Sequence, residues 1–254
     1  MLCFYTTEKS GQMLPIRTRA SLAPRRYSVC PLTSTHDTLN YLNIAYCSAA
    51  GGLTTSIILN WWLLAMLAFP EVQVRAHAEL DQVVGRTRAP TFADLPSLPY
   101  IRAMVQEVLR WSPPLPFGIP HASSADDWYE GKFIPKGTII LPNMRVINSN
   151  PAVFGVDSAR FNPAQHLDEK GEVKVKGGHE EGHVTFGYGR RLCPGRFVAE
   201  GTLAIDFATL LWALRFERSE GAQGELDVHT LVRIGIGACV FLLLRSWVRN
   251  DVTY

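Results

Sequence analysis

A cysteine in a glycine-rich loop is the residue whose setting is best suited to chemistry. Cys193 lies near the end of the segment Phe-Gly-Tyr-Gly-Arg-Arg-Leu-Cys-Pro-Gly, residues 186–195. Pro194 suits the first position of a following helix, where its missing N–H costs no hydrogen bond. The partial positive charge of that helix N-terminus and the neighbouring Arg190 and Arg191 favour the thiolate form of Cys193.

The glycines of this loop leave room close to the backbone. Gly189 and Gly195 carry no Cβ, so the chain there can approach a flat group closely. A lone cysteine outside such surroundings is commonly an inert buried thiol. The helix start, the arginines and the glycines together therefore favour a functional role for Cys193 over a packing role.

A carboxylate and a guanidinium share one face of an expected helix at residues 100–111. Glu107 and Arg110 are three positions apart, a spacing at which helical side chains can pair. On its own such a pair is commonly a solvated surface contact worth under about 1 kcal/mol.

An uncharged stretch, residues 44–69, carries small and hydroxyl residues near its middle, among them Gly51, Gly52, Thr54 and Thr55. Because about 20 apolar residues suffice to cross a bilayer, one interpretation is a membrane protein that spans once through this stretch. The central small and polar residues, and the lack of a flanking basic cluster, favour a buried core helix instead.

Taken together, these segments resemble the cytochrome P-450 family of haem-thiolate monooxygenases. The loop matches the family's haem-binding signature, F-x-x-G-x-R-x-C-x-G, at all its fixed positions: Phe186, Gly189, Arg191, Cys193 and Gly195. The resemblance implies heme b (iron protoporphyrin IX) as the cofactor and Cys193 as the axial thiolate ligand of its iron, which favours O–O cleavage. Phe186 would pack near the sulfur, and Arg191 would pair with a haem propionate, since a guanidinium matches a carboxylate bidentately.

Glu107-Val-Leu-Arg110 resembles the E-x-x-R motif of the same family. The resemblance implies a buried structural network in which Arg160 is the third member. The family usually has Pro-Glu before that arginine, whereas this chain has Ser158-Ala159. We therefore expect the network to survive with weaker bracing.

Two further sites come from the resemblance. Ala50–Thr55 is similar to the signature of the helix that crosses the distal haem face, which implies that Thr54 is catalytic and helps deliver protons to dioxygen. Leu53 stands where the family has an acid, so water or another group would have to substitute for it. His121, in a predicted β region, resembles a residue that contacts a haem propionate.

The elements that position these residues are mostly helical. Apolar spacing and proline or glycine punctuation predict helices at residues 44–69, 70–84, 100–111 and 196–216. Short strands are expected within residues 115–143, a loop-rich region over residues 148–183 and a terminal β-like piece at residues 231–244. The sequence therefore predicts a mainly α fold with a small β portion (α+β), the C-terminal part of the P-450 fold and incomplete. Residues 1–40 are expected to be an irregular segment and residues 41–254 the haem-binding part.

Composition narrows the class of partner. The net charge is +2 over 254 residues with scattered basic residues, which gives no reason to expect nucleic acid. The five cysteines are far apart and lack zinc spacing, which argues against a disulfide framework and a structural zinc site. From the pattern of residues 1–31 we expect neither a signal peptide nor an anchor there, although the family implies the endoplasmic reticulum membrane facing the cytosol.

By resemblance, the reaction is insertion of oxygen from dioxygen into a hydrophobic small molecule, with electrons from an NADPH-dependent reductase. The resemblance covers about residues 41–244 and omits the family's N-terminal half, so we expect a truncated family member. One alternative is a catalytically silent haem-binding fragment or interaction module, perhaps pairing with an N-terminal half in trans. Within the enzyme class, Leu53 at the acid position also leaves peroxide-driven or isomerase-like chemistry open.

Overall fold

The computed structural model describes residues 37–174, 182–218 and 244–248, and the chain divides into two units, Met1–Ala50 and Gly51–Tyr254. Of the segment expected to be irregular, residues 1–36 lie outside the described part, whereas residues 37–40 belong to the first helix, α1 (Asp37–Ala68). The predicted α+β class is confirmed, because helices dominate and the described strands form three two-stranded antiparallel sheets.

The second half of α1 is at the centre of the hydrophobic core. Ile58, Trp62, Leu64 and Met66 are almost completely buried, and Trp62 stacks on Phe207 with ring centroids 4.3 Å apart. By length and composition alone, Ser48–Ala68 could also cross a membrane. Burial of one half of the helix among other helices is the behaviour of a core helix in a globular protein.

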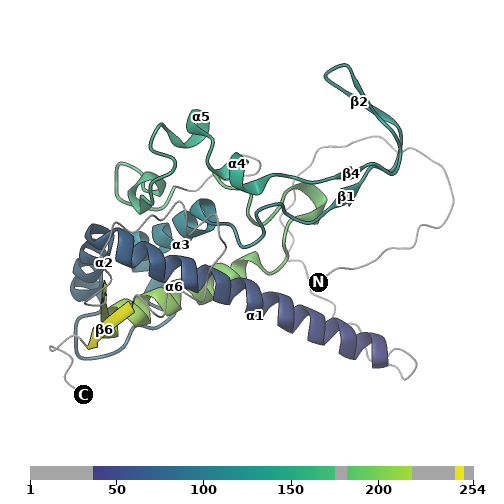
Figure 1. The fold of residues 1–254 in the computed structure, drawn as a ribbon. Helices are drawn as coiled ribbons and strands as arrows, with labels where there is room; N and C mark the ends of the chain where they lie inside the picture. Colours follow the sequence, from purple (N-terminus) through teal and green to yellow (C-terminus); the bar gives the residue numbers. More distant parts are fainter. Residues whose placement is uncertain (1–36, 175–181, 219–243, 249–254) are drawn as a thin grey trace, which may run out of the picture. The chain divides into compact units, whose positions relative to one another are not determined.

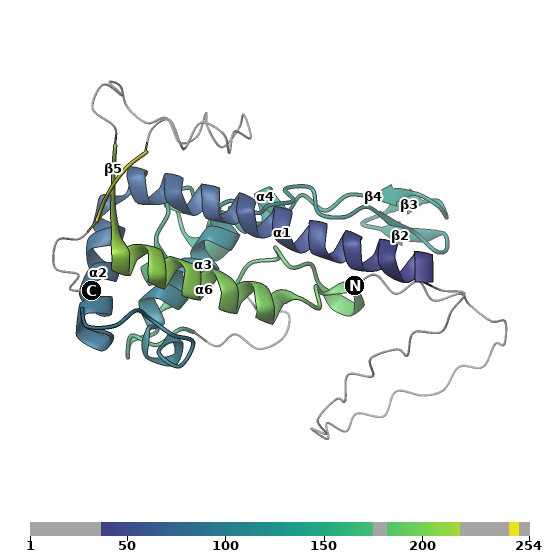
Figure 2. The same cartoon turned by 90° about the horizontal axis from the view of Figure 1, so that it is seen from below.

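Three helices pack with α1 around this core. They are α2 (Pro70–Val83), α3 (Pro99–Trp111) and α6 (Arg196–Ala213). In both Figure 1 and Figure 2, α6 lies alongside the second half of α1. The Glu79 carboxylate of α2 accepts hydrogen bonds from the backbone N–H groups of Tyr100 and Ile101 (2.8 and 3.0 Å). This cap satisfies donors that the first turn of α3 would otherwise leave unpaired.

The predicted helix at residues 196–216 ends three residues too late. It stops at Ala213, and Leu214–Arg218 forms strand β5, which pairs antiparallel with β6 (Leu244–Val248). The Gln73 side chain acts as a further strand neighbour, since it accepts from Phe216 N (2.7 Å) and donates to Phe216 O (3.0 Å). Tertiary partners therefore override the helical pattern there. Most of the predicted piece at residues 231–244 lies outside the described residues.

The predicted short strands are present between α3 and the loop region. β1 (His121–Ala122) pairs with β4 (Ile139–Ile140), and β2 (Asp127–Tyr129) pairs with β3 (Lys132–Ile134). Glu130 and Gly131 connect β2 to β3 with positive φ angles of 48° and 75°. Two such residues in succession are typical of the tight turn that suits a twisted hairpin.

Short helical turns lie at the start of the region expected to be loop-rich and within it. They are α4 (Met144–Asn148), α5 (Pro151–Phe154) and η2 (Pro163–His166), in addition to η1 (Leu95–Ser97) earlier in the chain. The side chains of Asn143, Asn150 and Asn162 each accept a hydrogen bond from the first turn that they precede. Asparagine caps thus start these turns where periodicity is too short to reveal them.

Candidate functional site

The cysteine loop is closed by its own backbone. Cys193 N–H donates to Phe186 O over 2.8 Å, which brings the two ends of the signature segment together. Gly187 and Gly189 have φ angles of +79° and +61°, which lie in the left-handed region that favours glycine. A short 3₁₀ turn, η4 (Gly189–Arg191), fills the loop, and α6 begins three residues after Cys193.

The thiol of Cys193 is free and half-buried at the start of α6. A Cβ added at Gly195 would lie 3.9 Å from Cys193 Sγ, so a larger side chain would crowd that side of the sulfur. Phe186 packs against the hydrophobic core, whereas Arg191 is exposed. The loop therefore presents one sulfur with a cation near it and glycine beside it.

This donor set fits the group that the sequence implies. Haem iron takes a single axial ligand from a cysteine in proteins of this kind. No cluster of three or more His, Cys, Asp or Glu side chains that could hold another metal ion occurs among the described residues. One accessible sulfur in a loop with little side-chain bulk is what a flat, monodentate cofactor requires.

The glycine-rich part of α1 has little bulk as well. A Cβ at Gly51 or Gly52 would meet no atom within 4 Å. The hydroxyl groups of Thr54 and Thr55 both donate to Gly51 O (3.3 and 2.8 Å), so they are hydrogen-bonded within the helix. Leu53, at the expected acid position, is 65% exposed. Proton delivery by Thr54 would thus involve a hydroxyl that already has a backbone acceptor.

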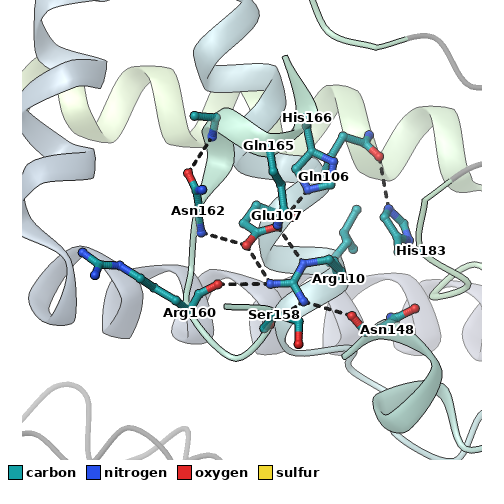
Figure 3. Close-up of polar contacts among 12 residues, drawn as sticks. Gln106, Glu107, Arg110, Asn148, Ser158, Arg160, Asn162, Gln165, His166 and His183 are labelled. Carbon is teal, nitrogen blue, oxygen red and sulfur yellow. Dashed lines mark hydrogen bonds and ion pairs between the residues drawn. The ribbon is translucent and has the colours of Figure 1, made fainter. Parts of the chain in front are cut away.

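Glu107 and Arg110 form a fully buried ion pair, shown at the centre of Figure 3. Both side chains are at most 1% exposed. All five N–H donors of Arg110 have acceptors: two go to Glu107, and the others go to the main-chain oxygens of Asn148, Ser158 and Arg160. This complete satisfaction is what allows a buried guanidinium to be retained.

Arg160 takes part in the network only through its main chain. Its carbonyl accepts from Arg110 at 3.2 Å, but its exposed guanidinium instead pairs with the exposed Glu71 at 2.8 Å. Gln165 Nε2 and His166 Nε2 occupy the remaining side of the carboxylate, at 2.6 and 2.8 Å from Glu107 Oε2.

Sequence reasoning missed Gln165 and His166. The available signal was Asn162-Pro163, a typical start of a helical turn. The Asn162 N–H also donates to Glu107 Oε1 at 2.8 Å, so this turn places three groups on one carboxylate. Burial alone would raise the pKa of Glu107, but the hydrogen bonds from Arg110 and His166 outweigh it, and the pKa lies below its ordinary value.

His183 is a second residue that sequence reasoning did not single out. Its ring lies near Phe186, with centroids 6.0 Å apart. Nε2 lies 3.1 Å from Gln106 Oε1, and Nδ1 accepts from Thr185 N–H at 3.3 Å. Burial, the largest cause, together with nearby His166 and Arg110 lowers the pKa of His183 to about 3, and the Glu107 carboxylate offsets this only in part. The ring is therefore neutral near pH 7.

His121 is exposed on β1, where its backbone pairs with Ile140 of β4. The pairing fixes the direction of the strand. Its predicted contact with a haem propionate stays a prediction.

Comparisons with known proteins point to one family. The sequence matches the Cytochrome P450 family over residues 35–236. It is 50% identical over 193 residues to a cytochrome P450 monooxygenase of Armillaria gallica, covering 74% of this chain and 37% of that protein. It is 49% identical over 176 residues to cytochrome P450 monooxygenase 58 of Postia placenta, covering 69% and 33%. A cytochrome P450 monooxygenase of Amanita muscaria is 38% identical over 225 residues, covering 70% and 40%.

The chain belongs to the cytochrome P450 family. It spans no more than about two fifths of the length of these curated relatives.

Proposed function

We propose that Cys193 is the axial thiolate ligand of haem b and that this chain supplies the ligand side of a haem-thiolate monooxygenase site. The observation that supports this most directly is the loop closed by the Cys193 N–H to Phe186 O bond, with a free thiol at the start of α6. A bound haem would supply the oxygen-activating chemistry, and the protein would supply orientation and electrostatics.

Each remaining site residue has a role in this proposal. Phe186 packs beside the sulfur, and the exposed Arg191 meets a propionate, with His121 as a second propionate contact. Thr54 holds a proton for delivery to dioxygen, with water in place of the acid that Leu53 replaces. Electrons come from an NADPH-dependent reductase that docks on the thiolate side, where Arg190 and Arg196 offer a small basic patch. The substrate is a hydrophobic small molecule.

The Glu107–Arg110 pair has a structural role in this proposal. It joins α3 to the main chain at Asn148, Ser158 and Arg160, and so fixes the region that lies between α3 and the cysteine loop. Its buried charges cannot reach a substrate.

Absorbance spectroscopy after haem reconstitution tests the proposal. The purified chain is incubated with hemin, reduced and exposed to carbon monoxide. Because the chain spans only part of the length of its relatives, we expect weak uptake, with a thiolate-type Soret band in the unaltered chain and in Cys3→Ser and loss of that band in Cys193→Ser. An identical spectrum in Cys193→Ser, or no uptake by the unaltered chain, would refute the assignment.

A second candidate function is that of a module that pairs with an N-terminal half in trans. Exposed apolar side chains on the segment after α3 and on or next to β4 favour it, because a lone soluble chain rarely leaves so many uncovered. They are Leu115, Phe117, Ile119, Ile139, Ile140 and Leu141. Co-expression with the N-terminal half of the Armillaria gallica relative tests this candidate. Co-purification that raises haem content supports it, and separate elution opposes it.

A further inference from the structure

One amide connects the segment that leads into the cysteine loop to the helix that follows the loop. Gln106, on α3, has its Oε1 atom 3.1 Å from His183 Nε2 and donates from Nε2 to Glu200 Oε1, also over 3.1 Å. His183 lies three residues before Phe186, and Glu200 lies in the second turn of α6. Figure 3 shows the contact between Gln106 and His183.

Hydrogen-bonding capacity allows one arrangement of protons along this chain of groups. The Glu200 carboxylate only accepts, so the NH₂ of Gln106 faces it and the amide oxygen faces His183. His183 must then carry its proton on Nε2. That leaves a lone pair on Nδ1, which accepts from Thr185 N–H at 3.3 Å. Donors and acceptors alternate from the loop backbone to α6 without a mismatch.

The segment that leads into the cysteine loop, residues 183–185, makes further hydrogen bonds to α3 and to Asn148. Thr185 Oγ1 donates to Leu109 O at 2.6 Å and accepts from Asn148 Nδ2 at 2.8 Å. Asn148 Oδ1 also accepts from Val184 N–H at 2.9 Å. Loss of the Gln106 amide would leave the hydrogen bond between Thr185 and α3 in place. It would remove the polar link from α3 to the first turns of α6, directly after Cys193.

We propose that Gln106 is a positioning residue that sets the cysteine loop by joining His183 to Glu200. Its importance for the cofactor rests on the proposed function, in which Cys193 binds haem iron. The amide itself touches no reacting atom. It acts by fixing where α6 begins relative to the segment that carries Phe186, and so where the sulfur lies.

Hydrogen exchange in the haem-free 254-residue chain, read by mass spectrometry on peptides that cover residues 183–200, tests the positioning. Gln106→Leu removes both bonds, and we expect amide exchange of the loop to become about tenfold faster. Gln106→Glu keeps the acceptor for His183 but places two carboxylates together, so the loop also loosens. Gln82→Leu, the same replacement at an exposed position of α2, is the matched control and leaves exchange unchanged.

The decisive variant exchanges the two groups. In Gln106→Glu/Glu200→Gln, a carboxylate on α3 can accept from both His183 and an amide on α6, so both hydrogen bonds return. We expect this double variant to restore slow exchange, including where either single variant fails to fold. Unchanged exchange in Gln106→Leu, or a double variant as loose as the single ones, would overturn the proposal.

A second arm separates this inference from the proposed function. After hemin addition, Gln106→Leu is expected to lose the thiolate-type spectrum faster than Gln82→Leu, and the double variant to regain it. If the unaltered chain binds no haem, the proposed function fails, yet the exchange measurements still decide whether Gln106 positions the loop. If haem binds and the exchange pattern is absent, the positioning role alone is wrong.

Discussion

His166 donates from Nε2 to Oε2 of the buried Glu107 carboxylate over 2.8 Å. The carboxylate can only accept, so the proton lies on Nε2 of the ring. Its Oε1 atom accepts from Arg110 and from the Asn162 main chain, and its Oε2 atom from Arg110, Gln165 and His166. His166 therefore contacts the Glu107 carboxylate where the sequence resemblance implied the side chain of Arg160.

Replacing His166 by Phe should destabilise the chain. The substitution removes a donor from a carboxylate that is 0% exposed, and leaving a buried acceptor underpaired costs about 1–3 kcal/mol. Urea unfolding followed by circular dichroism measures the change in the free energy of unfolding. His121→Phe, at an exposed position, is the control and should stay within about 0.5 kcal/mol. Equal effects at both positions would contradict the role of His166.

The two arginines near Glu107 should differ sharply. Arg110→Gln leaves the Glu107 charge without its main partner in the interior, which typically costs about 3–5 kcal/mol. Arg160→Gln removes an exposed pair with Glu71, which is worth under about 1 kcal/mol. The same urea titrations compare the two variants. A loss at Arg160 as large as the loss at Arg110 would mean that its guanidinium joins the buried network in solution.

The Arg160 result also shows where the sequence was informative. The helices at Pro70 and Pro99 follow from apolar spacing with proline starts, and Glu107 and Arg110 follow from an i, i+3 spacing on one helix face. These are local relations, and the sequence contains them in full. The third group that meets the Glu107 carboxylate is a long-range partner. Arg160 lies 53 residues and His166 lies 59 residues along the chain from Glu107, and periodicity says nothing about which of them makes the contact.

Gln106 and His183 illustrate the same limit. Each is an ordinary polar residue in its own segment. Their hydrogen bonds form only when the fold brings α3, the loop and α6 together. The predicted end of α6 was wrong for a related reason. The Gln73 amide and β6 give Phe216 strand-like hydrogen-bond partners, which helix propensity does not reveal.

Stability should fall as the solution becomes acidic, and His183 should account for the first part of the fall. Its pKa is about 3 in the folded chain, mainly because of burial, against an ordinary value of 6.5. Between these values the unfolded chain binds a proton that the folded chain does not, so stability is full above pH 6.5 and is lost as the pH falls. The slope approaches about 1.4 kcal/mol per pH unit for one proton.

The lowered pKa of Glu107 acts in the same direction, but only below its ordinary value of 4.5. Urea titrations between pH 7.5 and 5 therefore exclude the contribution of Glu107, and His183→Gln should flatten the profile there. His121→Gln serves as the matched control and should keep the slope of the unaltered chain. A slope that survives in His183→Gln would assign the acid sensitivity to other groups.

The loop around Cys193 should tolerate a methyl group poorly at one glycine, whereas a helical glycine tolerates it well. Gly189 has a φ of +61°, a conformation that costs other residues about 1–2 kcal/mol. Gly189→Ala should therefore lower the free energy of unfolding by that amount and speed alkylation of Cys193 by iodoacetamide, measured by peptide mass spectrometry. Gly201→Ala is the matched control, because its Cβ would meet no atom within 4 Å inside α6. There the same methyl group should raise stability by about 0.5–1 kcal/mol and leave the alkylation rate unchanged. If Gly189→Ala were as stable as Gly201→Ala, the left-handed turn that closes the cysteine loop would not exist in solution.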